Sequence, residues 1–202
     1  MLTRTKFTYE KAYVVLLDEY ADWEIGYALA ELHRLGNIEI VTVGFSEQPV
    51  TSMGGLLIHP HIVLSQVAPS QALLFLLSGG SLWEQEYPCE TIHMLEHHAV
   101  PIAAICAATT VLGHAGLFAN RKHTSNSLRY IEKLVPSYAS HAMYCDALAV
   151  TDKNIITASG LGSVDFTLNI LTLLNIATPK IRKMWYKAFK FGEYPKDIDE
   201  NA

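Results

Sequence analysis

Charged residues are scarce in this chain. They make up only 17% of its 202 residues, and the net charge is −5. Binding to nucleic acid or to an anionic membrane surface needs clustered positive charge, so we expect neither a nucleic-acid nor a membrane partner. Half of the residues are hydrophobic. This proportion is typical of an α/β protein whose central strands are covered on both faces, and it excludes general disorder.

Cysteine is also scarce. Cys89, Cys106 and Cys145 are odd in number and have no paired spacing, so the sequence predicts no disulfide framework. No apolar signal core precedes Tyr13. Together these absences predict a cytoplasmic protein.

An uninterrupted hydrophobic span is missing too. Segment 100–120 carries no formal charge, but polar and glycine residues such as Thr109, Gly113 and His114 interrupt it. A bilayer span needs about 18 to 20 consecutive apolar residues. A strand followed by a buried helix is therefore the better interpretation of this segment.

The usual metal and phosphate motifs are absent. The nine histidines form no H-E-x-x-H pattern and no cysteine–histidine pairing typical of zinc. Gly160-Leu161-Gly162-Ser163 lacks the lysine of a phosphate-binding loop, so Ser163 is interpreted as a helix N-cap. We therefore expect no metal ion and no cofactor.

Apolar strands and helices alternate along the whole chain. Strands are predicted at 12–17, 38–44, 72–77, 100–105, 121–125 and 155–159, extended segments at 142–144 and 147–150, and a hairpin or two edge strands within 53–64. Helices are predicted at 23–36 with Asp22 as N-cap, and at 90–98, 107–115, 127–134 and 164–175. This order predicts a single α/β domain over 1–202, with a parallel-rich sheet and helices on both faces. The basic, aromatic segment 178–195 is predicted to be a packed C-terminal helical tail rather than an interaction arm.

Cys106 stands where the strand 100–105 gives way to a helix, with the small residues Ala104 and Ala108 two positions to either side. This arrangement is typical of a nucleophile elbow, in which a tight turn exposes a reactive side chain. The start of the following helix would favour a thiolate. The alternative is that Cys106 is a small buried hydrophobic residue at a strand end.

Two other segments should lie beside Cys106, because the carboxyl ends of parallel strands meet at one edge of the sheet. Glu24 follows the first strand, and Gly79-Gly80 follow the third. A carboxyl group can move a proton, and a glycine pair can present backbone N–H groups. Taken alone, however, Glu24 also suits a solvated first helical turn, and Gly79-Gly80 a plain tight turn.

Taken together, these segments resemble the ThiJ/PfpI superfamily, which has the class I glutamine amidotransferase-like fold. The similarity runs from about Ala12 to Leu174. It is carried by Asp22-Trp23-Glu24, Leu77-Ser78-Gly79-Gly80, Ala103-Ala104-Ile105-Cys106, Ala115-Gly116-Leu117, Arg121-Lys122-His123-Thr124-Ser125 and Ile156-Thr157-Ala158-Ser159-Gly160-Leu161-Gly162-Ser163.

The resemblance implies a flavodoxin-like three-layer sandwich with Cys106 at the elbow and Glu24 in contact with its sulfur. It also implies that the backbone N–H groups of Gly80 and Ala107 form an oxyanion hole. Because a carboxylate and a thiolate at close range repel each other, we expect the pair to share one proton, held by Glu24.

The chain departs from the family where hydrolytic, glyoxalase or deglycase members carry a histidine. The two positions are Ala107 and Asn126 here. His123 should face away from the site, and His114 lies too far along the helix to reach Cys106. The sequence does not decide whether His141 reaches Cys106.

Three hypotheses follow for function. The first is an enzyme that uses Cys106 and Glu24 on a small carbonyl or electrophilic compound, with Asn126 positioning it. The second is a redox-responsive protein that senses oxidation at Cys106. The third is a binding protein whose chemistry has lapsed. The resemblance also implies a homodimer.

Overall fold

The computed structural model describes residues 10–84 and 88–195. At its centre is a seven-stranded sheet in the order β5-β2-β1-β6-β7-β9-β8. The strands are β1 (Lys11–Val15), β2 (Glu39–Gly44), β5 (Ile62–Val63), β6 (Ala72–Leu77), β7 (Ile102–Ile105), β8 (Ala149–Asp152) and β9 (Ile155–Ala158). Every neighbouring pair is parallel except β8 with β9. The predicted α/β fold with a parallel-rich sheet is confirmed.

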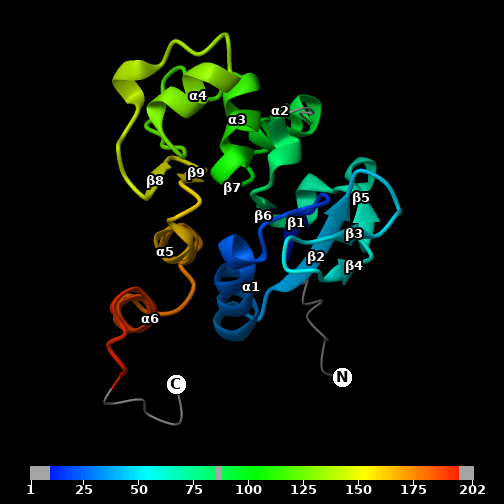
Figure 1. The fold of residues 1–202 in the computed structure, drawn as a ribbon. Coiled ribbons are helices and arrows are strands. Elements are labelled where there is room, and N and C mark those ends of the chain that lie inside the picture. The colour runs from blue at the N-terminus through cyan, green and yellow to red at the C-terminus, as the bar shows by residue number, and fades with distance from the viewer. Residues whose placement is uncertain (1–9, 85–87, 196–202) are drawn as a thin grey trace, which may run out of the picture.

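Helices cover both faces of this sheet (Figure 1). One layer contains α1 (Asp22–Gly36) and α5 (Ser163–Leu173), and the other contains α2 (Cys89–His97), α3 (Thr109–His114) and α4 (Leu128–Leu134). Side chains alternate along each strand, so Val14 packs in the core beneath α1 and α5, whereas Val15 packs in the core beneath α2, α3 and α4. Burial on both faces explains why the central strands are apolar throughout.

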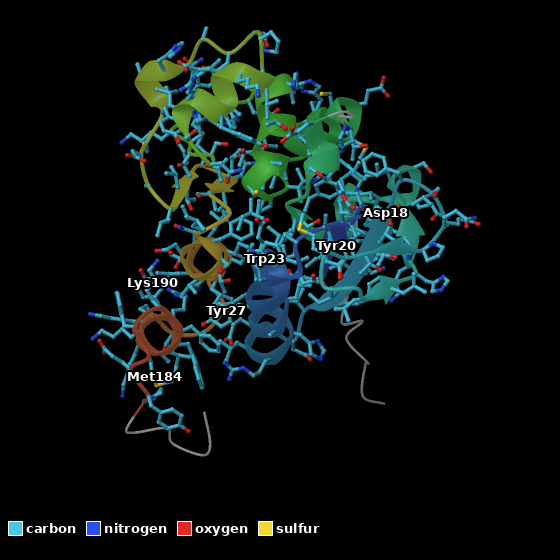
Figure 2. The ribbon with its side chains drawn as sticks, in the orientation of Figure 1. Asp18, Tyr20, Trp23, Tyr27, Met184 and Lys190 are labelled. Atoms are coloured by element: carbon cyan, nitrogen blue, oxygen red, sulfur yellow. The ribbon has the colours of Figure 1, made fainter. Side chains whose placement is uncertain are left out.

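The C-terminal helix α6 (Pro179–Phe191) packs outside this sandwich. Tyr27 of α1 stacks on Phe189 with ring centroids 4.1 Å apart, and the Lys190 ammonium lies 2.6 Å from the Asp165 carboxylate of α5. In Figure 2, the label of Tyr27 lies between α1 and α6. The helix predicted within 178–195 is therefore present and is packed against α1 and α5.

Several local predictions were wrong. Segment 121–125 contains only an isolated bridge between His123 and Tyr144, and residues 141–143 form a short 3-10 helix, η5 (His141–Met143), instead of an extended segment. The buried His123 ring stacks on Phe118 and bonds to the Tyr138 hydroxyl, and the N–H of Thr124 donates to the Thr157 hydroxyl instead of to the backbone of a neighbouring strand. Burial lowers the pKa of His123, which favours its neutral form.

Two predicted helix caps were also wrong. Asp22 and Ser163 are the first residues inside their helices, and Ala21 and Gly162 take the N-cap positions without a side-chain hydrogen bond. The Asp22 carboxylate is used elsewhere, because it accepts the N–H of Gly54 at 2.6 Å.

A two-stranded hairpin of β3 (Val50–Thr51) and β4 (Leu57–Ile58) lies against the loop between β1 and α1. Two further hydrogen bonds hold the hairpin in addition to the bond from Gly54. The N–H of Thr51 donates to the Asp18 carboxylate at 2.8 Å, and the N–H of Met53 donates to the Tyr20 carbonyl at 2.9 Å. These bonds fix the loop that leads into α1.

The strand order reverses beside β1. From β1 the chain first adds β2 and β5 on one side of it, and it then returns to add β6 on the other side. Ligands of such sheets bind at the carboxyl ends of the strands beside this reversal. Glu24 follows β1, Gly79 follows β6 and Cys106 follows β7. The topology thus brings all three segments to one edge of the sheet.

The helices formed by the described residues are all too short or too polar to serve as a membrane span.

Candidate active site

Cys106 lies at a sharp turn between β7 and α3. Its φ angle is 59°, and the chain continues through one 3-10 turn, η4 (Cys106–Ala108), into α3. A positive φ is uncommon for a residue with a side chain and persists only when the surroundings hold it. Here the Thr109 hydroxyl donates to the Cys106 carbonyl at 2.6 Å, and the Ser125 hydroxyl lies 2.7 Å from the Thr109 oxygen. The predicted elbow geometry is therefore present, with buried hydroxyl groups behind it.

Glu24 reaches the sulfur from the first turn of α1. It is only 2% exposed, and its carboxyl group hydrogen-bonds to the Cys106 side chain. The N–H of Gly79 approaches the carboxyl group, yet the buried Oε2 makes no well-formed hydrogen bond with any described residue. An incompletely paired carboxyl group in such a place holds its proton tightly.

Both members of this pair have raised pKa values. Burial raises the pKa of Glu24 to about 7, and the Cys106 bond and the Gly79 N–H oppose this shift only in part. Burial, together with the negative charge of Glu24, raises the pKa of Cys106 to about 11. The expectation that the helix start would favour the thiolate was wrong in direction, because burial and repulsion outweigh the donors at the sulfur. Because the pKa of Cys106 is above that of Glu24, the proton that the pair retains at neutral pH lies on the sulfur, so the expectation that Glu24 holds it was also wrong.

Asn126 supplies one of those donors. Its Nδ2 lies 3.3 Å from the Cys106 sulfur, and its Oδ1 accepts the N–H of Gly160 at 3.0 Å. The second bond fixes the amide orientation, because only an oxygen can accept from a backbone N–H. Asn126 itself is exposed, so the sulfur is accessible from the solvent side of this amide.

Two glycines allow the close approach of Glu24 and Cys106. A Cβ at Gly79 would overlap Oε2 of Glu24 and lie 2.8 Å from the Cys106 Cβ. A Cβ at Gly160 would lie 2.7 Å from Oε1 of Glu24 and 3.0 Å from the sulfur. Gly160 is not among the site residues predicted from the sequence, where its segment is interpreted as a helix-capping loop. The one signal was its position directly after the last strand.

The two groups assigned to an oxyanion hole lie beside the elbow. The N–H of Ala107 bonds to the Cys106 sulfur and lowers its pKa slightly. The Gly80 carbonyl accepts the N–H of Trp83 at 3.3 Å, and the Gly80 Cα faces Leu17 and Tyr20. An oxyanion role for Gly80 and Ala107 stays a prediction.

The three weighed histidines bond to groups outside the site. His123 bonds to the Arg121 carbonyl and the Tyr138 hydroxyl, and His114 bonds to the Leu134 carbonyl at 3.0 Å. His141, which the sequence left open, lies 2.8 Å from the Glu132 carboxylate. Among the described residues, no group of three or more histidine, cysteine or acidic side chains is arranged to hold a metal ion.

Comparison with known proteins is consistent with this geometry. A sequence model of the DJ-1/PfpI family matches residues 10–173. The Bacillus subtilis protein named "Uncharacterized protease YoaZ" is 33% identical over 190 residues, covering 89% of this chain and 90% of its own. The crystal structure of a ThiJ/PfpI family protein from Bacillus anthracis is similar with a TM-score of 0.84 and 32% identity, over 91% of this chain and 92% of that one. A DJ-1 superfamily protein from Agrobacterium tumefaciens, Atu0886, has a TM-score of 0.83 and 30% identity, over 89% and 96% of the two chains.

Substitution of Gly79 by alanine should destabilise the protein by about 1–3 kcal/mol, because its Cβ must displace Glu24 or the elbow. Gly26→Ala is the matched control. Gly26 is exposed within α1, and a Cβ there meets no atom within 4 Å, so this variant should gain about 0.5–1 kcal/mol. Chemical denaturation measures both effects. Equal stabilities for the two variants would contradict the steric argument.

The thiol titration of Cys106 should depend on Glu24 and Asn126. Glu24→Gln removes a negative charge that raises the Cys106 pKa, so the apparent pKa should fall, whereas Asn126→Ala removes a donor and should raise it. Thiolate absorbance against pH, in a Cys89→Ser/Cys145→Ser background, measures the change. Glu39→Gln at the start of β2 is the charge-matched control. An unchanged titration in Glu24→Gln would show that the two groups are not coupled.

Proposed function

The chain belongs to the DJ-1/PfpI family, and from this premise we propose that it is a cysteine-dependent enzyme acting on a small carbonyl or other electrophilic compound. The observation that carries the proposal is the contact between a buried carboxyl group and a partly exposed thiol at a positive-φ elbow. Perturbed, mutually coupled acids at a strand-end crevice are typical of catalytic sites.

The proposed first step is addition of the sulfur to the carbonyl carbon. A bond forms between carbon and the Cys106 sulfur, the carbonyl π bond breaks, and the thiol proton passes to the Glu24 carboxylate. The new alkoxide then takes that proton from Glu24, so the products balance as a hemithioacetal. The raised pKa of Glu24, about 7, suits a group that both accepts and returns a proton near neutral pH.

Asn126 takes the place of a histidine in this proposal. Its amide can donate a hydrogen bond to the sulfur or to the substrate oxygen, but it cannot accept and release a proton at neutral pH. The reaction therefore depends on Glu24 for proton transfer. This dependence favours carbonyl addition over cleavage of an unactivated amide, whose leaving nitrogen needs its own proton donor.

Redox sensing at Cys106 is the second candidate. The N–H groups of Asn126 and Ala107 face the sulfur and could stabilise an oxidised sulfur. Redox sensing ranks below the enzymatic function because the raised pKa of Cys106 leaves little thiolate to react with peroxide at neutral pH.

Turnover should require Cys106 and Glu24. We expect Cys106→Ser to abolish activity, Glu24→Gln to lower it about 10²–10⁴-fold, and Asn126→Ala to lower it about two- to tenfold. The assay is a panel of α-oxoaldehydes, glycated amines, small amides and isocyanides, with Cys89→Ser and Cys145→Ser as unaffected controls. Absence of Cys106-dependent turnover on the whole panel would count against the enzyme and favour the lapsed binding protein.

We also propose a homodimer formed through an exposed apolar set that we call the hairpin patch: Trp23, Met53, Leu56 and Leu57. Trp23 is 60% and Leu57 61% exposed, and the Gly54–Asp22 bond holds the hairpin tip against the start of α1. Figure 2 shows Trp23 at that end of α1. Unpartnered apolar surface of this kind is typical of an interface.

Light scattering after size exclusion should show a dimer at micromolar concentration. Leu57→Glu should shift the protein toward monomer, because it places a charge within the hairpin patch. Leu161→Glu is the control, since Leu161 is more exposed, at 87%, but lies outside the patch. A monomeric wild type, or equal dissociation in both variants, would refute this interface.

A further inference from the structure

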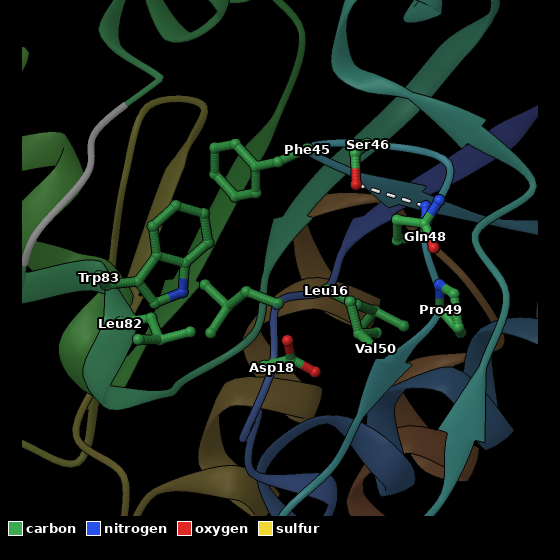
Figure 3. Close-up of a pocket in the computed structure, with 10 residues that line it drawn as sticks. Leu16, Asp18, Phe45, Ser46, Gln48, Pro49, Val50, Leu82 and Trp83 are labelled. Atoms are coloured by element: carbon green, nitrogen blue, oxygen red, sulfur yellow. Dashed lines mark hydrogen bonds between the residues drawn. The ribbon is translucent and has the colours of Figure 1, made fainter.

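An open cavity of about 280 Å³ lies at the carboxyl ends of β1 and β2 (Figure 3). Its walls come from the end of β1, the loop after β2 and the 3-10 turn η3 (Ser81–Glu84). The proposed chemistry at Cys106 and Glu24 does not use the residues that line it. Its size suits a small molecule.

One side of the cavity is apolar and rigid. Phe45 meets Trp83 edge-on, with ring centroids 5.7 Å apart, and Leu82 lies beside them. The Trp83 ring is held in place because its Nε1–H donates to the Ser78 carbonyl at 2.6 Å. Trp83 is itself fully buried, so the accessible apolar surface of the cavity is that of Phe45 and Leu82, which are 42% and 36% exposed.

The other side carries a carboxylate. Asp18 lines the cavity, and its Oδ1 accepts the N–H of Thr51, which fixes the carboxylate in the orientation drawn in Figure 3. Ser46 and Gln48, from the loop after β2, complete the polar rim. An exposed carboxylate at the rim of a cavity attracts a cation.

The charge around this edge of the sheet has one sign. The loops 16–24, 44–56, 78–84, 106–110, 125–127 and 159–163 contain no lysine or arginine. The same loops hold the acidic residues Asp18, Glu19, Asp22, Glu24, Glu47 and Glu84. The resulting field attracts cations and repels anions.

We propose that this cavity binds a primary ammonium group carried on an aromatic or aliphatic body, with the ammonium at Asp18 and the body against Phe45 and Leu82. The site adjoins the elbow, because η3 packs on η4 and the Leu17 side chain faces the Cα of Gly80. The cavity lining itself includes neither Cys106 nor Glu24. The idea that the cavity serves as a specificity subsite for amine-bearing substrates rests on the proposed function. The binding of an ammonium compound to the cavity does not depend on that function.

The test is a titration of ¹⁵N-labelled protein at constant ionic strength with three ligands of one shape: benzylammonium, benzyl alcohol and benzoate. The chain has three tryptophans, so Trp83→Phe assigns the indole N–H signal that lies at the cavity. We expect that signal to shift in a saturable way, with affinity falling from benzylammonium to the alcohol to benzoate. Asp18→Asn should weaken benzylammonium about two- to fivefold and leave the alcohol unchanged.

Glu39→Gln, an exposed acid at the opposite edge of the sheet, is the matched control and should change no affinity. Any one of three results would overturn the proposal. These results are benzoate binding as tightly as benzylammonium, equal effects of Asp18→Asn and Glu39→Gln, and a saturable shift that occurs only at Trp23 or Trp185. The titration is repeated on Cys106→Ser, where binding should be unchanged. Ammonium preference without Cys106-dependent turnover would therefore refute only the proposed function, and turnover without that preference would refute only the cavity.

Discussion

The candidate site depends on the close approach of two acidic groups, the Glu24 carboxyl and the Cys106 thiol, within a space that admits no extra methyl group. Gly79 and Gly160 close that space from two different strand ends, and a Cβ on either would lie within 3.0 Å of atoms of the pair. Burial raises the pKa values of both groups, and the negative charge of Glu24 raises the pKa of Cys106 further. The chemistry proposed for the protein follows from this shared proton.

The rest of the fold serves to hold that contact. Parallel pairing of β1, β6 and β7 places the segments that follow them at one edge of the sheet, where the strand order reverses. The hairpin secures the loop before Glu24 from one side, and the hydroxyl groups of Thr109 and Ser125 secure the Cys106 turn from the other. The Asn126 amide accepts a hydrogen bond from Gly160, which follows β9, and donates one to the Cys106 sulfur. Each acidic group is thus positioned by contacts outside the pair.

Much of this architecture could be predicted from the sequence. Apolar strands alternate with amphipathic helices at a spacing that few folds accommodate, so the sheet, its layers and the elbow at Cys106 followed from local pattern. The predictions failed where non-local contacts override local preference. Asp22 and Ser163 are typical N-cap residues, yet Asp22 bonds to the hairpin and neither residue caps its helix. Segment 121–125 has strand-like alternation, but the buried stacking of His123 on Phe118 replaces a regular strand.

The sequence by itself determined that Glu24, Gly79 and Cys106 follow three strands whose ends share an edge, because hydrophobic periodicity indicates the strands, and its resemblance to the ThiJ/PfpI superfamily implied that Cys106 and Glu24 form a pair. Only the tertiary structure decided how those residues behave. Burial, which depends on every neighbour, reversed the expected direction of the Cys106 pKa shift. The orientation of the Asn126 amide and the need for glycine at position 160 likewise arise from contacts between segments distant in the chain. No local pattern in the sequence records such distances, and they set the electrostatics of the site.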